Sequence, residues 1–101
     1  MRLSDAIMAG SKLRPQAFGT YFDGTGSCAM EAASEAAGFN GSTSLLIKWP
    51  ILGLMVNCPK CDKWCSLWDI IINLNDHHKA SREWIACWVR EIEARVDAGV
   101  R

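Results

Sequence analysis

A chain of 101 residues is long enough for one small domain, and we expect residues 1–101 to form one. Half of the residues are hydrophobic and five are tryptophan, a composition that excludes intrinsic disorder and predicts a packed core. The 11 basic residues balance 11 acidic ones, so the formal net charge is zero and no overall field attracts the chain to nucleic acid or to an anionic membrane.

The sequence predicts neither export nor membrane insertion. The N-terminus from Met1 to Asp5 carries early charge and lacks an apolar signal-peptide core. The longest apolar run, residues 45–56, contains Lys48 and Pro50 and is too short to span a bilayer. Five cysteines without an export signal are typical of reduced thiols, so we expect a cytoplasmic protein with no membrane partner.

Two helices are predicted in the first half of the chain. Ser4 can cap a helix that runs to about Leu13. Ser27 can cap a second helix over residues 28–37, whose five alanines permit close approach by another helix. Gly38 stands where a left-handed C-cap is expected.

Residues 45–56 are the only good strand candidate. Trp49 and Pro50 divide this run into two short arms, which we expect to pair with each other or with another segment. Turn-forming residues predict loops over residues 19–26 and 40–44.

The second half predicts two more helices. Apolar residues at helical spacing indicate a helix over residues 66–74, which Asn75 and Asp76 end. Ser81 caps the last helix, whose buried face consists of Ile85, Trp88, Val89, Ile92 and Val96. The expected fold is therefore mainly α (α+β), with four helices, a short β-hairpin and a zinc-knuckle-like Cys-x-x-Cys turn.

The most informative pattern is a cluster of cysteines and histidines between residues 58 and 78. Cys58 and Cys61 form a Cys-Pro-Lys-Cys turn, whose spacing can direct two thiolates at one ion. Two further ligands are expected from four residues: Cys65, His77, His78 and Cys28. This set predicts a structural zinc ion, which in small domains contributes on the order of 10 kcal/mol to folding.

Other chemistries could use the same residues. The thiols could be ordinary buried side chains, as we expect for Cys28 and Cys87. The Cys-Pro-Lys-Cys pair could also be a redox site, although a thiol oxidoreductase fold needs several strand–helix alternations. A catalytic zinc needs a carboxylate in fixed relation to a ligand, and the sequence has no such motif. We therefore expect a protein that is not an enzyme.

Four short motifs resemble a group of small bacterial and phage-borne proteins of unknown function. The motifs are Ser-Cys-Ala at 27–29, Cys-Pro-x-Cys at 58–61, Leu-Asn-Asp-x-His at 74–78 and Ser-Arg-Glu-x-Ile-Ala-x-Trp at 81–88. The resemblance implies that His78 rather than His77 is the ligand, and that Cys65 is dispensable. It implies no activity.

The first functional hypothesis is a protein-interaction module. Trp64 and Trp84 lie off the main apolar stripes of their segments, so we expect them to be exposed anchors for a protein partner. The alternative is that both tryptophans cover the core or the metal site. The apolar surface of residues 45–56 also makes a homodimer plausible.

The second hypothesis is nucleic-acid binding by a helix-turn-helix-like C-terminal half. Lys79, Arg82 and Arg90 could contact phosphate. However, Glu83, Glu91 and Glu93 alternate with these arginines, which is typical of a solvated helix face. Nucleic acid is therefore the less favoured partner.

Overall fold

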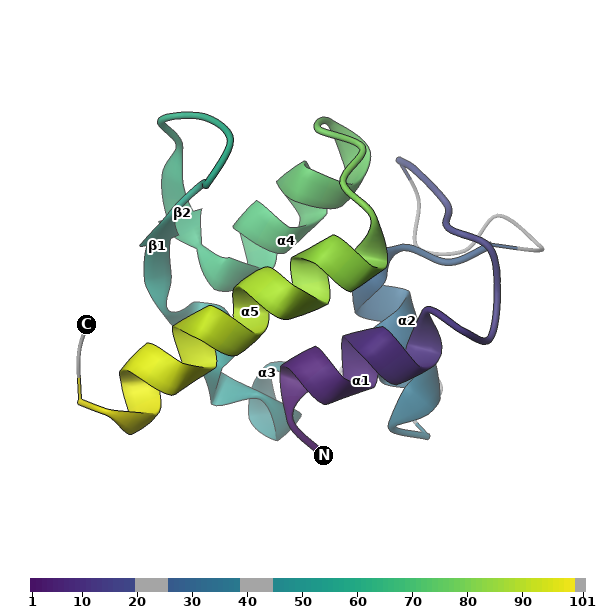
Figure 1. Cartoon of the computed structure of the whole chain (residues 1–101), viewed down its shortest axis with the longest axis horizontal. Coiled ribbons are helices and arrows are strands. Elements are labelled where there is room, and N and C mark those ends of the chain that lie inside the picture. Colours follow the sequence, from purple (N-terminus) through teal and green to yellow (C-terminus); the bar gives the residue numbers. More distant parts are fainter. Residues whose placement is uncertain (20–25, 39–44, 100–101) are drawn as a thin grey trace.

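The computed structural model describes residues 1–19, 26–38 and 45–99 of the chain. Most of the predicted loop over residues 19–26, and the whole of the loop over 40–44, lie outside these residues. Figure 1 shows the arrangement of the described elements, which in chain order are α1 (Leu3–Gly10), α2 (Ala29–Ala36), α3 (Leu45–Lys48), η1 (Pro50–Gly53), β1 (Met55–Asn57), β2 (Trp64–Ser66), α4 (Leu67–Asp76) and α5 (Arg82–Asp97).

Helices α1 and α2 pack with their backbones in close contact. A Cβ atom added at Gly10 would lie 1.8 Å from the carbonyl oxygen of Ala32, so only glycine fits there. The alanine-rich α2 thus permits the close approach that its sequence predicts. The expected end of the first helix at Leu13 is wrong, because α1 ends at Gly10 and residues 11–13 form turns.

The predicted helix caps Ser4 and Ser27 are both wrong, because their hydroxyls bond to residues of α5. Ser4 lies inside α1 and its hydroxyl donates to the buried carboxylate of Glu93 on α5. Helix α2 is capped by Cys28, whose sulfur accepts from the backbone N–H of Glu31 at 3.4 Å. Gly38 has the left-handed φ of +83° expected just beyond the helix end.

The long helix α5 crosses the middle of the molecule between α1 and α4 (Figure 1). Ser81 caps it as predicted, because its hydroxyl accepts from the backbone N–H of Trp84 at 3.1 Å. Its inward residues Ile85, Val89 and Ile92 belong to one core with residues of α1, α2 and α4. Burial of this apolar face is what fixes α5 on the rest of the domain.

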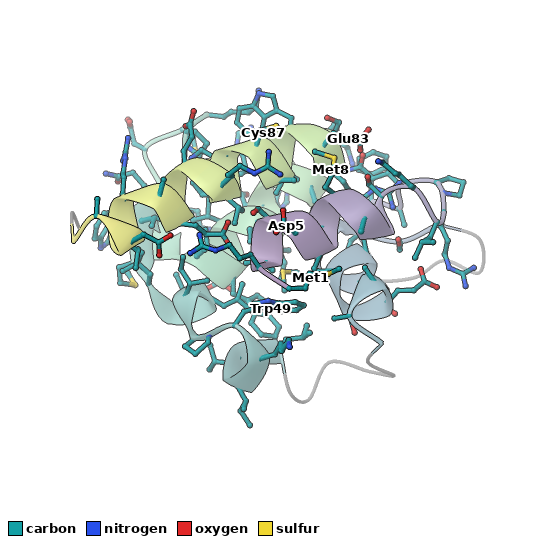
Figure 2. The ribbon with its side chains drawn as sticks, turned by 60° about the horizontal axis from the view of Figure 1, so that its bottom comes forward. Met1, Asp5, Met8, Trp49, Glu83 and Cys87 are labelled. Carbon is teal, nitrogen blue, oxygen red and sulfur yellow. The ribbon has the colours of Figure 1, made fainter. Side chains whose placement is uncertain are left out.

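The expectation of a strand over residues 45–56 is mostly wrong. The run begins with α3, continues with η1, and becomes extended only at β1. Trp49 is buried and its indole N–H donates to the carbonyl of Met1 at 3.0 Å, with both residues on one side of the molecule (Figure 2). Pro50 then starts a 3-10 turn, because its ring fixes φ and it has no N–H to donate to a ladder.

The hairpin forms between β1 and β2, on either side of the Cys-x-x-Cys turn. The two strands are antiparallel, with Val56 opposite Cys65 and Asn57 opposite Trp64. A backbone hydrogen bond of 2.8 Å from Cys58 N to Lys63 O closes the loop. The domain is therefore mainly helical with one short hairpin, as the sequence predicts, but its described residues form five α-helices rather than four, because α3 replaces part of the expected strand. In the part of the chain that the structure describes, no helix is long and apolar enough to cross a membrane.

Candidate metal centre

The hairpin loop presents two sulfur atoms at one point. Cys58 follows β1 directly and is buried, whereas Cys61 lies three residues later and is exposed. The backbone amides of Lys60 and Cys61 lower the pKa of the Cys58 thiol. The turn therefore favours the thiolate form that a metal ion requires.

The linker between α4 and α5 brings a histidine to the same point. Helix α4 ends when the backbone N–H groups of His77 and His78 both bond to the carbonyl of Asn73, at 2.9 and 3.2 Å. Lys79 then has a left-handed φ of 55°, which turns the chain towards α5. The hairpin loop and this linker lie along the same edge of the molecule, at the top of Figure 1.

Cys58, Cys61 and His78 together form a group that could hold a metal ion. One ligand atom from each residue lies within 4.8 Å of the other two. Two sulfurs bound tetrahedrally to zinc stand about 3.8 Å apart, given a Zn–S bond of about 2.3 Å. A small inward movement of the three side chains would therefore supply three of the four ligands of a tetrahedral zinc ion.

Asn73 supports the two sulfur atoms from inside the protein. Its side-chain amide nitrogen lies 3.8 Å from Cys58 Sγ and 3.9 Å from Cys61 Sγ, within donor distance for sulfur. An N–H donor favours the thiolate form that a metal ion requires. The sequence analysis did not single out Asn73, and the available signal was a polar residue interrupting the apolar run from Ile70 to Leu74.

The electrostatic surroundings also favour ionised Cys58. Burial raises the pKa of its thiol, but hydrogen bonds to the sulfur from Lys60, Cys61 and Asn73 outweigh burial. The pKa of Cys58 therefore lies below its ordinary value. Cys28 provides the contrast, because burial is the dominant effect there and raises the pKa of its thiol.

The other expected ligands lie outside this group in the described part of the chain. Cys65 is on β2, half-buried, and His77 is exposed at the end of α4. Cys28 is the cap of α2 and is buried, as expected. Cys87 was expected in the core, but it is exposed on the outer side of α5 (Figure 2). Its neighbour Trp88 is the residue that packs against the core.

Both tryptophans expected at the surface are exposed, but their surroundings differ. Trp84 is 40% exposed and the ammonium of Lys60 lies 4.7 Å from its ring centroid. Trp84 therefore packs against the cysteine loop. Trp64 is 55% exposed and borders a groove of about 820 Å³ between the hairpin and the C-terminal half of α5. The groove is lined mostly by apolar side chains, from Pro50, Ile51, Leu54, Met55, Val56, Ile92 and Val96.

The residues proposed for phosphate contact do not form a free basic face. Arg82 is wrong as a phosphate ligand, since it is 4% exposed and its guanidinium donates to Ser27, Ser11 and Arg14. Burial also lowers the pKa of Arg82.

The other two cations of that hypothesis are exposed, but both already have neighbours. The Lys79 ammonium lies 4.6 Å from the ring centroid of Phe18. Arg90 forms an ion pair with Asp5 at 3.5 Å. Each of these two cations therefore already interacts with a side chain of the protein.

No protein-family model, curated protein sequence or solved structure matches the chain.

Proposed function

We propose that this chain is a zinc-stabilised, non-enzymatic domain whose surface binds a protein partner. The single observation that carries the proposal is the group of Cys58, Cys61 and His78. Two thiolates and one imidazole are the soft donor set that selects zinc over magnesium or calcium. An ion there would fasten the hairpin loop to the α4–α5 linker.

The redox alternative uses the same two cysteines, and His78 favours the metal. A redox pair needs only a second thiol, whereas an imidazole within 4.8 Å of both sulfurs would provide a third metal ligand. The structure also lacks, in its described residues, the strand–helix alternation on which thiol oxidoreductases rely: its sheet consists of β1 and β2 alone.

Zinc titration tests the metal part of the proposal. Protein purified with a phosphine reductant would be titrated against a chromophoric chelator. We expect one Zn²⁺ per chain, and a loss of affinity of at least about 100-fold in Cys61→Ser, because a bound ligand is removed. Cys87→Ser is the matched control, since Cys87 is exposed on α5 and outside the group; both variants would be titrated at a protein concentration low enough to keep the chain monomeric. Equal affinity of the two variants would contradict the proposal.

The metal would also shape the partner-binding surface. The hairpin that it fastens carries Met55 and Trp64, which line the apolar groove. The groove also includes Arg95. A partner segment with apolar side chains and one carboxylate therefore fits this surface.

Peptide selection tests this surface. Peptides displayed on phage would be selected against the zinc-loaded protein. We expect binders rich in apolar residues whose affinity falls about 30-fold in Trp64→Ala, equivalent to about 2 kcal/mol for a central anchor. Trp84→Ala should bind them normally, because Trp84 packs against the cysteine loop and does not line the groove. Equal losses in both variants would argue against the groove.

A second copy of the chain is one candidate partner for the same groove. Helix α3 exposes Leu46 and Ile47, at 52% and 81%, as apolar side chains that such a groove could take. If the partner is a second copy, the mass in sedimentation equilibrium should rise with concentration in the wild type and stay constant in Trp64→Ala. A monomer in both would leave a different protein as the partner.

A further inference from the structure

The candidate centre supplies three ligands, whereas zinc in protein sites takes four. Within residues 1–19, 26–38 and 45–99, no fourth cysteine, histidine, aspartate or glutamate joins Cys58, Cys61 and His78. Three protein ligands are the number found in zinc sites that keep one coordination position for water or another molecule.

The burial of the three ligands indicates where the fourth position faces. Cys58 is buried and Asn73 covers the sulfur atoms from inside the protein. Cys61 is exposed and His78 is half-buried, so the ion would lie at the surface. A fourth ligand would therefore approach from solvent.

The donor atoms of the centre indicate which ligand suits the fourth position. Two thiolates and a neutral imidazole already cancel the charge of Zn²⁺. The two lysines nearest the ligands in sequence lie over aromatic rings: Lys60 is 4.7 Å from the ring centroid of Trp84, and Lys79 is 4.6 Å from that of Phe18. The softness of the ligand atom, rather than the surrounding charge, therefore decides which ligand the ion takes.

We propose that the ion at this centre has an open fourth position, filled by water in the free protein, which binds an external thiolate. Thiolate is a soft donor, and it suits an ion that the chain already holds through two thiolates. In the exchange the zinc–water bond breaks and a zinc–sulfur bond forms, while the thiol proton passes to solvent. The inference rests on the proposed zinc site.

Cobalt substitution tests this directly, because Co²⁺ takes the same ligands as zinc and its absorption reports on them. Ethanethiol would be added to the Co²⁺ protein, with ethanol as the matched control. We expect the sulfur-to-cobalt charge-transfer band to increase about 1.5-fold with ethanethiol, since three sulfur bonds replace two, and to stay constant with ethanol. A band that does not respond to ethanethiol would overturn the open position.

The design separates failure of the site from failure of the inference. If Co²⁺ does not bind, or binds equally well to Cys61→Ser, the proposed zinc site itself is wrong. If Co²⁺ binds and the band is already that of three thiolates at every protein concentration, a fourth protein ligand is present. Loss of the third thiolate in Cys65→Ser would identify that ligand as Cys65 and overturn the proposal.

Two sources of thiolate can be told apart in the same experiment. A third sulfur bond that appears only at high protein concentration, and disappears in Cys87→Ser, would assign the thiolate to the exposed Cys87 of a second copy. A response to ethanethiol with a spectrum independent of protein concentration would assign the position to a small thiol. Either result supports the open position.

Discussion

The two sides of this domain are held together differently. Helices α1 and α2 meet through backbone contact at Gly10, and buried Arg82 bonds to residues of two preceding segments. The hairpin consists of two strands of three residues each and meets the α4–α5 linker through Cys58, Cys61 and His78. An isolated hairpin of this size is marginal in water. One side therefore contains a close-packed helix pair, and we expect the hairpin side to depend more on the proposed zinc ion.

Removal of the proposed zinc ion should reveal the difference in stability between the two sides most clearly. With zinc chelated, we expect Tm to fall by more than about 10 °C, because a structural zinc contributes several kcal/mol in a domain of this size. Amide hydrogen exchange should accelerate first over residues 55–66 and 77–80, which the ion would join. Equal acceleration in α1 and α2 would show that the two sides do not differ.

Substitution of Gly10 should damage the other side. Gly10→Ala places a methyl group 1.8 Å from Ala32 O, so α1 and α2 must separate, at a cost of about 3 kcal/mol. Gly53→Ala is the matched control, because its nearest neighbour would be Leu46 Cδ1 at 3.8 Å, an ordinary contact. Denaturant unfolding with and without zinc would measure both. The Gly10→Ala cost should not depend on zinc, and a cost that disappears in the metal-free protein would contradict the comparison.

Loss of the buried guanidinium should be the next largest effect. Arg82→Met would leave the hydroxyl of Ser27 and the carbonyls of Ser11 and Arg14 without this donor, a loss of about 2 kcal/mol. Arg90→Met removes an arginine of the same helix whose ion pair is exposed, and should cost less than about 0.5 kcal/mol. Chemical denaturation of the two variants would compare them. Equal costs would mean that the bonds of Arg82 add nothing to stability.

The smallest effect expected is at Asn73. Asn73→Ala should weaken zinc affinity about 10-fold, because the amide donates to both sulfurs without binding the ion. His77→Ala is the control, since His77 is exposed and outside the group, and its affinity should match the wild type. Competition with a chromophoric chelator gives both values. A larger loss in His77→Ala than in Asn73→Ala would mean that His77 is the ligand.

The sequence predicts the parts of this fold that local patterns determine. Helix α5 has a serine cap and a continuous apolar stripe, and the Cys-x-x-Cys spacing identifies two of the three grouped residues. Exposure of Trp64 and Trp84 is also correct, because both residues lie off the apolar stripes.

The errors arise where distant segments decide the outcome. β2 forms only because the cysteine loop folds the chain back onto β1, and Trp64-Cys65-Ser66 has no strand pattern of its own. Arg82 alternates with acidic residues as a solvated arginine would, yet carbonyls from residues 11 and 14 enclose it. By contrast, His78 lies beside the two cysteines, as the resemblance of the Leu-Asn-Asp-x-His motif implies.

X-ray absorption at the zinc edge is the most direct test that an ion joins the hairpin to the linker. We predict two sulfur ligands at about 2.3 Å and two lighter ligands at about 2.0 Å, one of them with the scattering of an imidazole. The imidazole contribution should disappear in His78→Ala. Four sulfur ligands, or an imidazole signal that persists in His78→Ala, would contradict the account.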